Sequence, residues 1–147
     1  ALFNLGAALQ AEGKPEEAGK YYRQERQFRP GDAVVETALG GVLQAQGKTE
    51  EAVRHYRATL SASPKYAHAH YNLGIILLRQ GEFGEAAEQF RAVLAFNPND
   101  ASSHNDLGSA LASQGKWREA AIEFQSALQL NPQNADAHDN LGYILAR

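Results

Sequence analysis

The stretch that decides the fold is YNLGIILLRQG, residues 71 to 81. Its apolar residues Leu73, Ile76 and Leu77 recur at helical spacing, so the stretch predicts an amphipathic helix. Gly74 lies inside that helix, where a glycine costs about 1 kcal/mol relative to alanine because its backbone loses more freedom on folding. The reason for a glycine at this position must therefore lie outside the helix itself.

The same glycine recurs every 34 residues along the whole chain. The set is Gly6, Gly40, Gly74, Gly108 and Gly142, and a leucine precedes each of them. Further sets in the same register are a glycine (Gly13, Gly47, Gly81, Gly115), an alanine (Ala18, Ala52, Ala86, Ala120), an aromatic residue (Tyr22, Tyr56, Phe90, Phe124) and a proline (Pro30, Pro64, Pro98, Pro132). Agreement among so many positions indicates a true internal repeat, which is the signature of stacked structural units.

Each recurring residue has a physical role in a pair of helices. Gly81 follows a helical stretch, where a left-handed C-terminal cap favours glycine. Pro98 ends the second helix, because the residue before a proline avoids helical geometry. Asp32, Asp100 and Asn134 follow two residues after a proline, where they can cap the next helix. Each unit is therefore predicted to be two antiparallel helices.

The period predicts an all-α fold made of one solenoid over residues 1–147. We expect four units at 1–32, 33–66, 67–100 and 101–134, followed by the first helix of a fifth unit at 135–147, which gives nine helices. Helix axes pack about 8 to 10 Å apart, depending on the contact residues. We predict that Gly74 faces Ala86 on the partner helix and allows the short end of that range.

This pattern resembles the tetratricopeptide repeat family over the whole chain. The matching residues run Leu73-Gly74, then Gly81, Ala86, Phe90 and Pro98, and the sequence is most similar in pattern to the repeat arm of O-GlcNAc-transferase-like proteins and to bacterial members. The resemblance implies a right-handed superhelix of stacked helix pairs. It also implies a concave groove, lined by one face of the first helix of each unit, that binds protein or peptide partners.

Composition excludes several classes of partner. The formal net charge is −3 with no basic cluster, which argues against a nucleic-acid surface. No apolar run reaches the length of a membrane span. Zero cysteines exclude disulfides and thiolate metal sites, but they leave the compartment open, with the cytoplasm favoured. The absence of methionine, even at residue 1, favours a fragment of a larger protein, and we expect more repeats or another domain after the last helix.

Three histidines, His70, His104 and His138, share one position in successive units, which could indicate a metal site. Zinc–nitrogen bonds are about 2.0–2.1 Å long, whereas equivalent residues on stacked helices lie about one helix diameter, roughly 10 Å, apart. By analogy with the bulky residue that tetratricopeptide units place there, we predict partly buried packing residues and no metal.

No residues indicate catalysis. Gly47-Lys48-Thr49 matches the end of a phosphate-binding loop, but that motif needs a glycine where Val42 stands. No Ser, His and Asp set can be assembled from the spacing. We therefore predict a protein that is not an enzyme and uses no cofactor.

Asparagines in the predicted groove suggest how a peptide could be held. Asn4, Asn72 and Asn140 share one position, with Ala38 and Asp106 between them. A side-chain amide offers both a donor and an acceptor, so it can hold the main chain of an extended peptide. The arm of O-GlcNAc-transferase-like proteins carries such an asparagine ladder. The ladder here is incomplete, and hydrogen bonding to local polar groups explains these asparagines equally well.

The candidate peptide-binding residues combine this ladder with its neighbours on the same face. They are Asn4, Asn72, Asn140, Tyr71, His68, Ile75, Arg79, Asn105, Asp106, Asp136 and Asp139. The predicted groove face also includes Phe3, Ala7, Gln10, Val34, Thr37, Ala38, Gly41, Gln44, Ser102, Ser109 and Tyr143. The face is aromatic near Tyr71 and acidic near its end. A ligand with apolar residues followed by Lys or Arg would suit it.

Three functions fit the sequence. The first is a non-catalytic interaction module that holds an extended partner segment in the groove. The second is a substrate-recruiting arm of a larger enzyme, such as a glycosyltransferase. The third is a scaffold that self-associates end to end through the uncapped C-terminal helix, which carries Leu141, Tyr143, Ile144 and Leu145.

Overall fold

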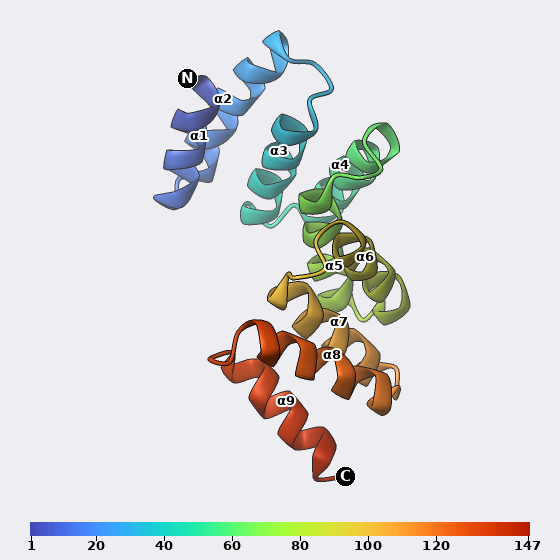
Figure 1. Cartoon of the computed structure of the whole chain (residues 1–147). Coiled ribbons are helices and arrows are strands. Elements are labelled where there is room, and N and C mark those ends of the chain that lie inside the picture. Colours follow the sequence, from blue (N-terminus) through green and yellow to red (C-terminus); the bar gives the residue numbers. More distant parts are fainter. The chain divides into compact units, whose positions relative to one another are not determined.

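The computed structural model describes residues 1–147, and all of its regular secondary structure is helical (Figure 1). The helices are α1 (Leu2–Ala11), α2 (Pro15–Phe28), α3 (Ala33–Ala45), α4 (Thr49–Ala62), α5 (Ala67–Gln80), α6 (Phe83–Phe96), α7 (Ala101–Ser113), α8 (Trp117–Leu130) and α9 (Ala135–Leu145). The predicted all-α fold of nine helices is confirmed. Each helix is too short or too polar to pass through a bilayer.

The turn glycines end the first helix of each pair as predicted. Gly13, Gly47, Gly81 and Gly115 have φ between 75° and 82°. This left-handed conformation is strained for residues with a side chain, so glycine is favoured there. Pro15 stands at the first position of α2, where its missing N–H has no helical partner to lose.

Two of the three predicted N-caps bond to the backbone of their helix. The Asp32 carboxylate accepts from the Val34 and Val35 amides at 2.9 and 3.2 Å, and Asn134 accepts from the Ala137 amide at 3.0 Å. Asp100 also precedes its helix but makes no such bond. Its carboxylate instead accepts from the hydroxyl three residues later, on Ser103, at 2.6 Å.

The chain divides inside α5 into two compact parts, here called the N-terminal part (Ala1–Asn72) and the C-terminal part (Leu73–Arg147). In the N-terminal part, α1, α2, α3 and α4 each pack on the next helix along the chain. In the C-terminal part, α6, α7, α8 and α9 do the same, and α7 also contacts α9. Packing between sequential helices is what a two-helix repeat requires.

Gly74 makes room for an aromatic ring. A Cβ added to it would lie 2.8 Å from Cε1 of Phe90. The same arrangement joins Gly6 to Tyr22, Gly40 to Tyr56 and Gly108 to Phe124. The aromatic residue, and not the predicted Ala86, therefore supplies the nearest atoms, because its ring reaches farther across the helix interface than a methyl group does.

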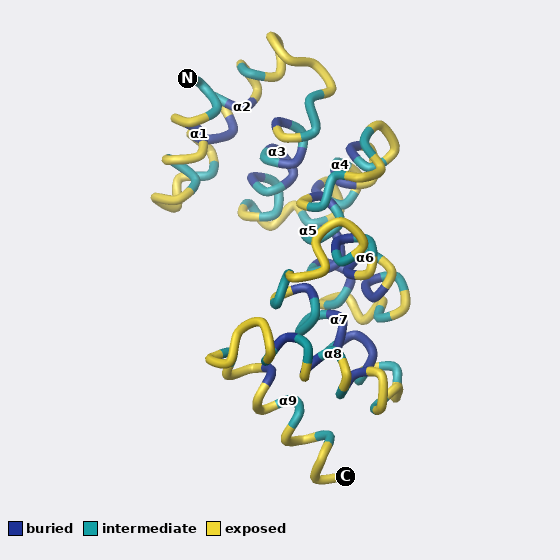
Figure 2. The backbone as a smooth tube through the Cα atoms, in the orientation of Figure 1, coloured by how far each residue is buried: buried dark blue, intermediate teal, exposed yellow.

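Gly142 differs from the other four members of its set. A Cβ added there would have no atom within 4 Å. Figure 2 shows α9 exposed along most of its length. Tyr143 and Leu145 are 56% and 71% exposed. The last helix thus exposes apolar side chains, and the space beside its glycine is empty.

Candidate functional site

The predicted groove residues in the N-terminal part differ in exposure. Asn4 and His68 are exposed, whereas Tyr71 and Asn72 are half-buried. Of the two asparagines, Asn4 offers its amide freely to solvent. Asn72 does not, because a side-chain hydrogen bond joins it to Tyr56.

A buried hydrogen-bond network surrounds the Tyr56 hydroxyl. Tyr56 is fully buried, and its hydroxyl donates to Oε1 of Gln44 at 3.3 Å. The hydrogen bond with Asn72 engages the same group. Burial raises the pKa of the Tyr56 phenol from 10.0 to about 12, and the Asn72 bond opposes part of that rise. At this position the asparagine satisfies a local polar group.

Stability should fall between pH 10 and pH 12 partly because of Tyr56. Burial raises its pKa in the folded chain to about 12, so over this range the unfolded chain releases the proton while the folded chain keeps it. Proton release then favours unfolding. Denaturant titrations at pH 9, 10, 11 and 12 should give a shallower fall for Tyr56→Phe than for the unmodified chain. An equal fall of stability with pH in both proteins would contradict the raised pKa of the Tyr56 phenol.

The predicted groove residues in the C-terminal part concentrate on α7 and α9. Arg79, Asp136 and Asp139 are exposed, and Ile75, Asn105, Asp106 and Asn140 are half-buried. The Asn105 amide nitrogen donates to the Asp106 carboxylate at 3.3 Å, while its amide oxygen is buried without a partner. On α9, Asp136, Asp139, Asn140 and Tyr143 lie at positions i, i+3, i+4 and i+7, so they share one face.

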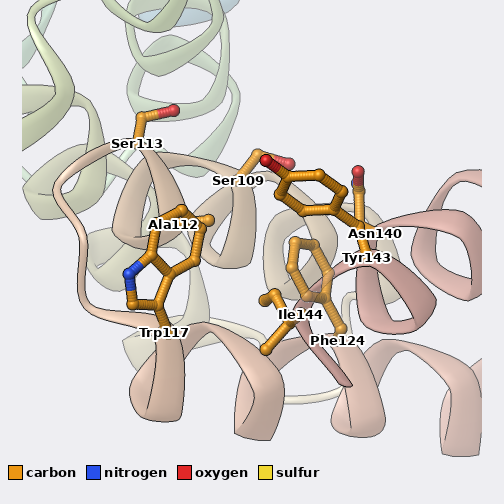
Figure 3. Close-up of a pocket in the computed structure, with 8 residues that line it drawn as sticks. All are labelled: Ser109, Ala112, Ser113, Trp117, Phe124, Asn140, Tyr143 and Ile144. Atoms are coloured by element: carbon orange, nitrogen blue, oxygen red, sulfur yellow. The ribbon is translucent and has the colours of Figure 1, made fainter. Parts of the chain in front are cut away.

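A pocket of about 260 Å³ opens between α7, α8 and α9 in the C-terminal part. Its lining residues are Ser109, Ala112, Ser113, Trp117, Phe124, Asn140, Tyr143 and Ile144. Figure 3 shows Trp117 on one side and Tyr143, Ile144 and Phe124 on the other, with the two serine hydroxyls along an edge. None of the lining residues carries a charge. The pocket therefore has an apolar wall and a polar rim, and the Arg147 guanidinium lies against two of its rings.

Two aromatic rings of this pocket are held together by an arginine. The Trp117 and Tyr143 rings lie 6.5 Å apart. The Arg147 guanidinium carbon is 4.7 Å from the centre of the Trp117 ring and 4.8 Å from that of Tyr143. Such cation–π contacts stabilise the position of both rings.

The row of histidines ties each proline turn to the following helix. Nε2 of His70, His104 and His138 lies 2.8, 2.9 and 2.8 Å from the carbonyl oxygens of Pro64, Pro98 and Pro132. Nδ1 of His104 also lies 2.7 Å from the Glu123 carboxylate. His70 and His104 are half-buried and His138 is exposed. Half-burial of His70 and His104 agrees with their prediction as partly buried packing residues, whereas His138 departs from it because its side chain is exposed.

Family models identify the repeat. Tetratricopeptide repeat models match residues 1–33, 37–101 and 108–147. The chain belongs to the tetratricopeptide repeat family. Tetratricopeptide repeats generally mediate protein–protein interactions, and proteins built from them are typically non-enzymatic scaffolds.

Solved structures of tetratricopeptide repeat proteins resemble this chain closely. Residues 41 to the end of MamA from Desulfovibrio magneticus RS-1 are 26% identical, with a TM-score of 0.88 over 99% of this chain and 82% of that solved chain. MamA of strain AMB-1 is 21% identical, with a TM-score of 0.86 over 99% and 86%. A chain of the APC/C hetero-tetramer Cut9–Hcn1 is 20% identical, with a TM-score of 0.86 over 98% and 29%. The last two likenesses concern the fold alone. No match was found among curated proteins.

The sequence did not point to every residue that lines the pocket of this tetratricopeptide repeat chain. Asn140, Ser109 and Tyr143 are predicted groove positions, and the structure brings them together at one pocket. Trp117, Ala112 and Phe124 join them, and none of these three is a predicted groove residue. The available signal was a departure from the repeat, since Ala112 replaces the glutamine found at Gln10 and Gln44.

Proposed function

We propose that this chain is a non-catalytic protein–protein interaction module that holds an extended segment of a partner against the face formed by α7 and α9. The observation that carries the proposal is that groove positions on two different helices, Ser109 on α7 and Asn140 and Tyr143 on α9, line one pocket. Peptide recognition commonly combines polar partners for the main chain with pockets for alternate side chains. This face offers both.

Charge on the same face favours a basic partner. Asp136 and Asp139 are exposed on the stripe of α9 that leads to the pocket, and complementary charge speeds and selects association. We place binding here and not at Asn72, because the Asn72 amide is already engaged with Tyr56.

Selection from a display library of linear peptides tests the proposal. We expect the enriched peptides to contain Lys or Arg, and Asp139→Lys to weaken their binding by roughly tenfold through like-charge repulsion. Glu88→Lys makes the same charge change at an exposed position on α6 and should leave the affinity unchanged. Fluorescence anisotropy with labelled peptides gives both dissociation constants. If both substitutions weaken peptide binding equally, or if neither weakens it, the peptides bind at another surface.

Self-association through α9 is a second candidate function, which would make the chain a scaffold. It is favoured by the exposed side chains of Tyr143 and Leu145 and by the open space beside Gly142. Sedimentation velocity on the same samples separates the two candidates. A sedimentation coefficient that rises with concentration, and falls when a selected peptide is added, would favour the scaffold.

A further inference from the structure

A glutamine–tyrosine pair fills the space between helices in the N-terminal part. The Tyr22 hydroxyl donates to Oε1 of Gln10 at 3.0 Å, and the Tyr56 hydroxyl donates to Oε1 of Gln44 at 3.3 Å. The Gln10 side chain also covers the next first helix, because a Cβ on Gly41 would lie 3.1 Å from its Nε2. Gln10 and Gln44 both belong to the predicted groove face.

The pocket in the C-terminal part lies where this pair is missing. Two periods of 34 residues along the chain, the positions of Gln44 and Tyr56 are held by Ala112 and Phe124. Both residues line the pocket. The substitutions remove an amide and a hydroxyl from a site whose backbone frame is repeated, so the space that they filled is open. The repeat between them also lacks the pair, with Leu78 and Phe90 at these positions, so we attribute the pocket to the small Ala112 side chain together with Phe124.

The loss of the hydroxyl also changes what Asn140 can do. Asn140 stands at the position of Asn72 in its repeat, and Asn72 bonds to the Tyr56 hydroxyl. Phe124 has no hydroxyl to offer. The Asn140 amide therefore lines the pocket without that partner, and it can bind the main chain of a ligand with both a donor and an acceptor.

The size and polarity of the pocket define which side chain can occupy it. A cavity of about 260 Å³ is smaller than the roughly 300–1,000 Å³ of sites for small molecules. The walls are Trp117, Phe124, Ala112 and Ile144, with no charged residue in the lining. Burying a charged side chain there would be costly, whereas burying an apolar one is favourable. The pocket therefore suits one bulky uncharged side chain.

The acidic stripe of α9 adds a second requirement. Asp139 and Asp136 precede Tyr143 by four and seven residues, which places their Cα atoms about 6 and 10 Å away along the helix axis. An extended peptide spans about 3.3 Å per residue. A basic residue about two or three positions from the anchor would therefore reach one of these carboxylates.

We propose that the pocket binds a leucine, isoleucine or phenylalanine side chain of an extended partner segment that carries Lys or Arg two or three positions away. The Asn140 amide holds the main chain beside this anchor, and Asp136 and Asp139 pair with the basic residue. The inference rests on the proposed function and names its ligand class.

Acetylated and amidated decapeptides of Ser and Gly test this inference. Each contains one variable residue (Leu, Phe, Ala or Asp) and one Lys two or three positions to either side. Trp117 is the sole tryptophan, so its fluorescence and its indole N–H resonance report binding at the pocket directly. We expect the Leu and Phe peptides to shift both signals and to bind about tenfold more tightly than the Ala peptides.

The variant Ala112→Gln/Phe124→Tyr restores the pair of the N-terminal part and should abolish the preference for Leu and Phe. Leu78→Gln/Phe90→Tyr makes the same change one repeat earlier, and this variant should still prefer the Leu and Phe peptides. If the first variant unfolds, Ala112→Leu fills the pocket with the residue found at position 78 and serves the same purpose. If the variant with the filled pocket still prefers the Leu peptide, the inference is wrong, whereas the proposed function is unaffected. If neither these peptides nor any library peptide binds, the proposed function fails as well.

Discussion

Replacing Gly74 with leucine should lower the free energy of unfolding by about 2 kcal/mol or more, even though leucine is the better helix former. A Cβ at this position would lie 2.8 Å from Cε1 of Phe90 and 3.0 Å from Cζ. The Phe90 ring is fully buried, so it cannot swing into solvent to make room. Urea or guanidinium unfolding monitored by circular dichroism measures the loss.

Alanine substitutions at Gly74 and Gly142 provide a matched comparison within one repeat position. Both glycines lie inside helices, so intrinsic propensity alone would make each substitution stabilising by up to about 1 kcal/mol. Gly142→Ala meets no atom within 4 Å and should not lower stability. Gly74→Ala must displace the ring and should destabilise. The same sign for both substitutions would contradict the contact between Gly74 and Phe90.

Replacing Phe90 with alanine should destabilise the chain by about 3–5 kcal/mol, the usual range for a fully buried phenylalanine. The ring is 0% exposed, and its removal leaves a cavity that rigid neighbouring helices only partly close. Calorimetry should show a lower melting temperature for Phe90→Ala than for Phe96→Ala, since Phe96 is 48% exposed on the same helix.

A double-mutant cycle joins the two predictions. In the Phe90→Ala background the ring is absent, so Gly74→Ala should become neutral or stabilising through helix propensity. A cost for Gly74→Ala that is equal in both backgrounds would show that something other than the ring opposes the added methyl group. The cycle therefore tests the reason for glycine at this position in the repeat.

The comparison between Asn72 and Asn140 has a consequence for how repeat proteins acquire binding sites. The two residues occupy one position in the period, yet one is bonded to a tyrosine hydroxyl and the other lines an open pocket. The difference arises at Phe124 and Ala112, which lie on other helices. A pocket can thus appear in one repeat through changes that leave the scaffold unaltered.

The sequence by itself determined the helices, because their ends depend on local chemistry. Gly81 takes a left-handed turn and Asp32 caps its helix, and neither depends on distant contacts. The resemblance to tetratricopeptide repeats implied that Ser109, Asn140 and Tyr143 belong to one groove face. Only the tertiary structure decided that Gly74 meets Phe90 rather than Ala86, and that Trp117, Phe124 and Asn140 surround one pocket. Those contacts join residues on different helices, so they depend on side-chain size and reach, which the spacing of a repeat does not specify.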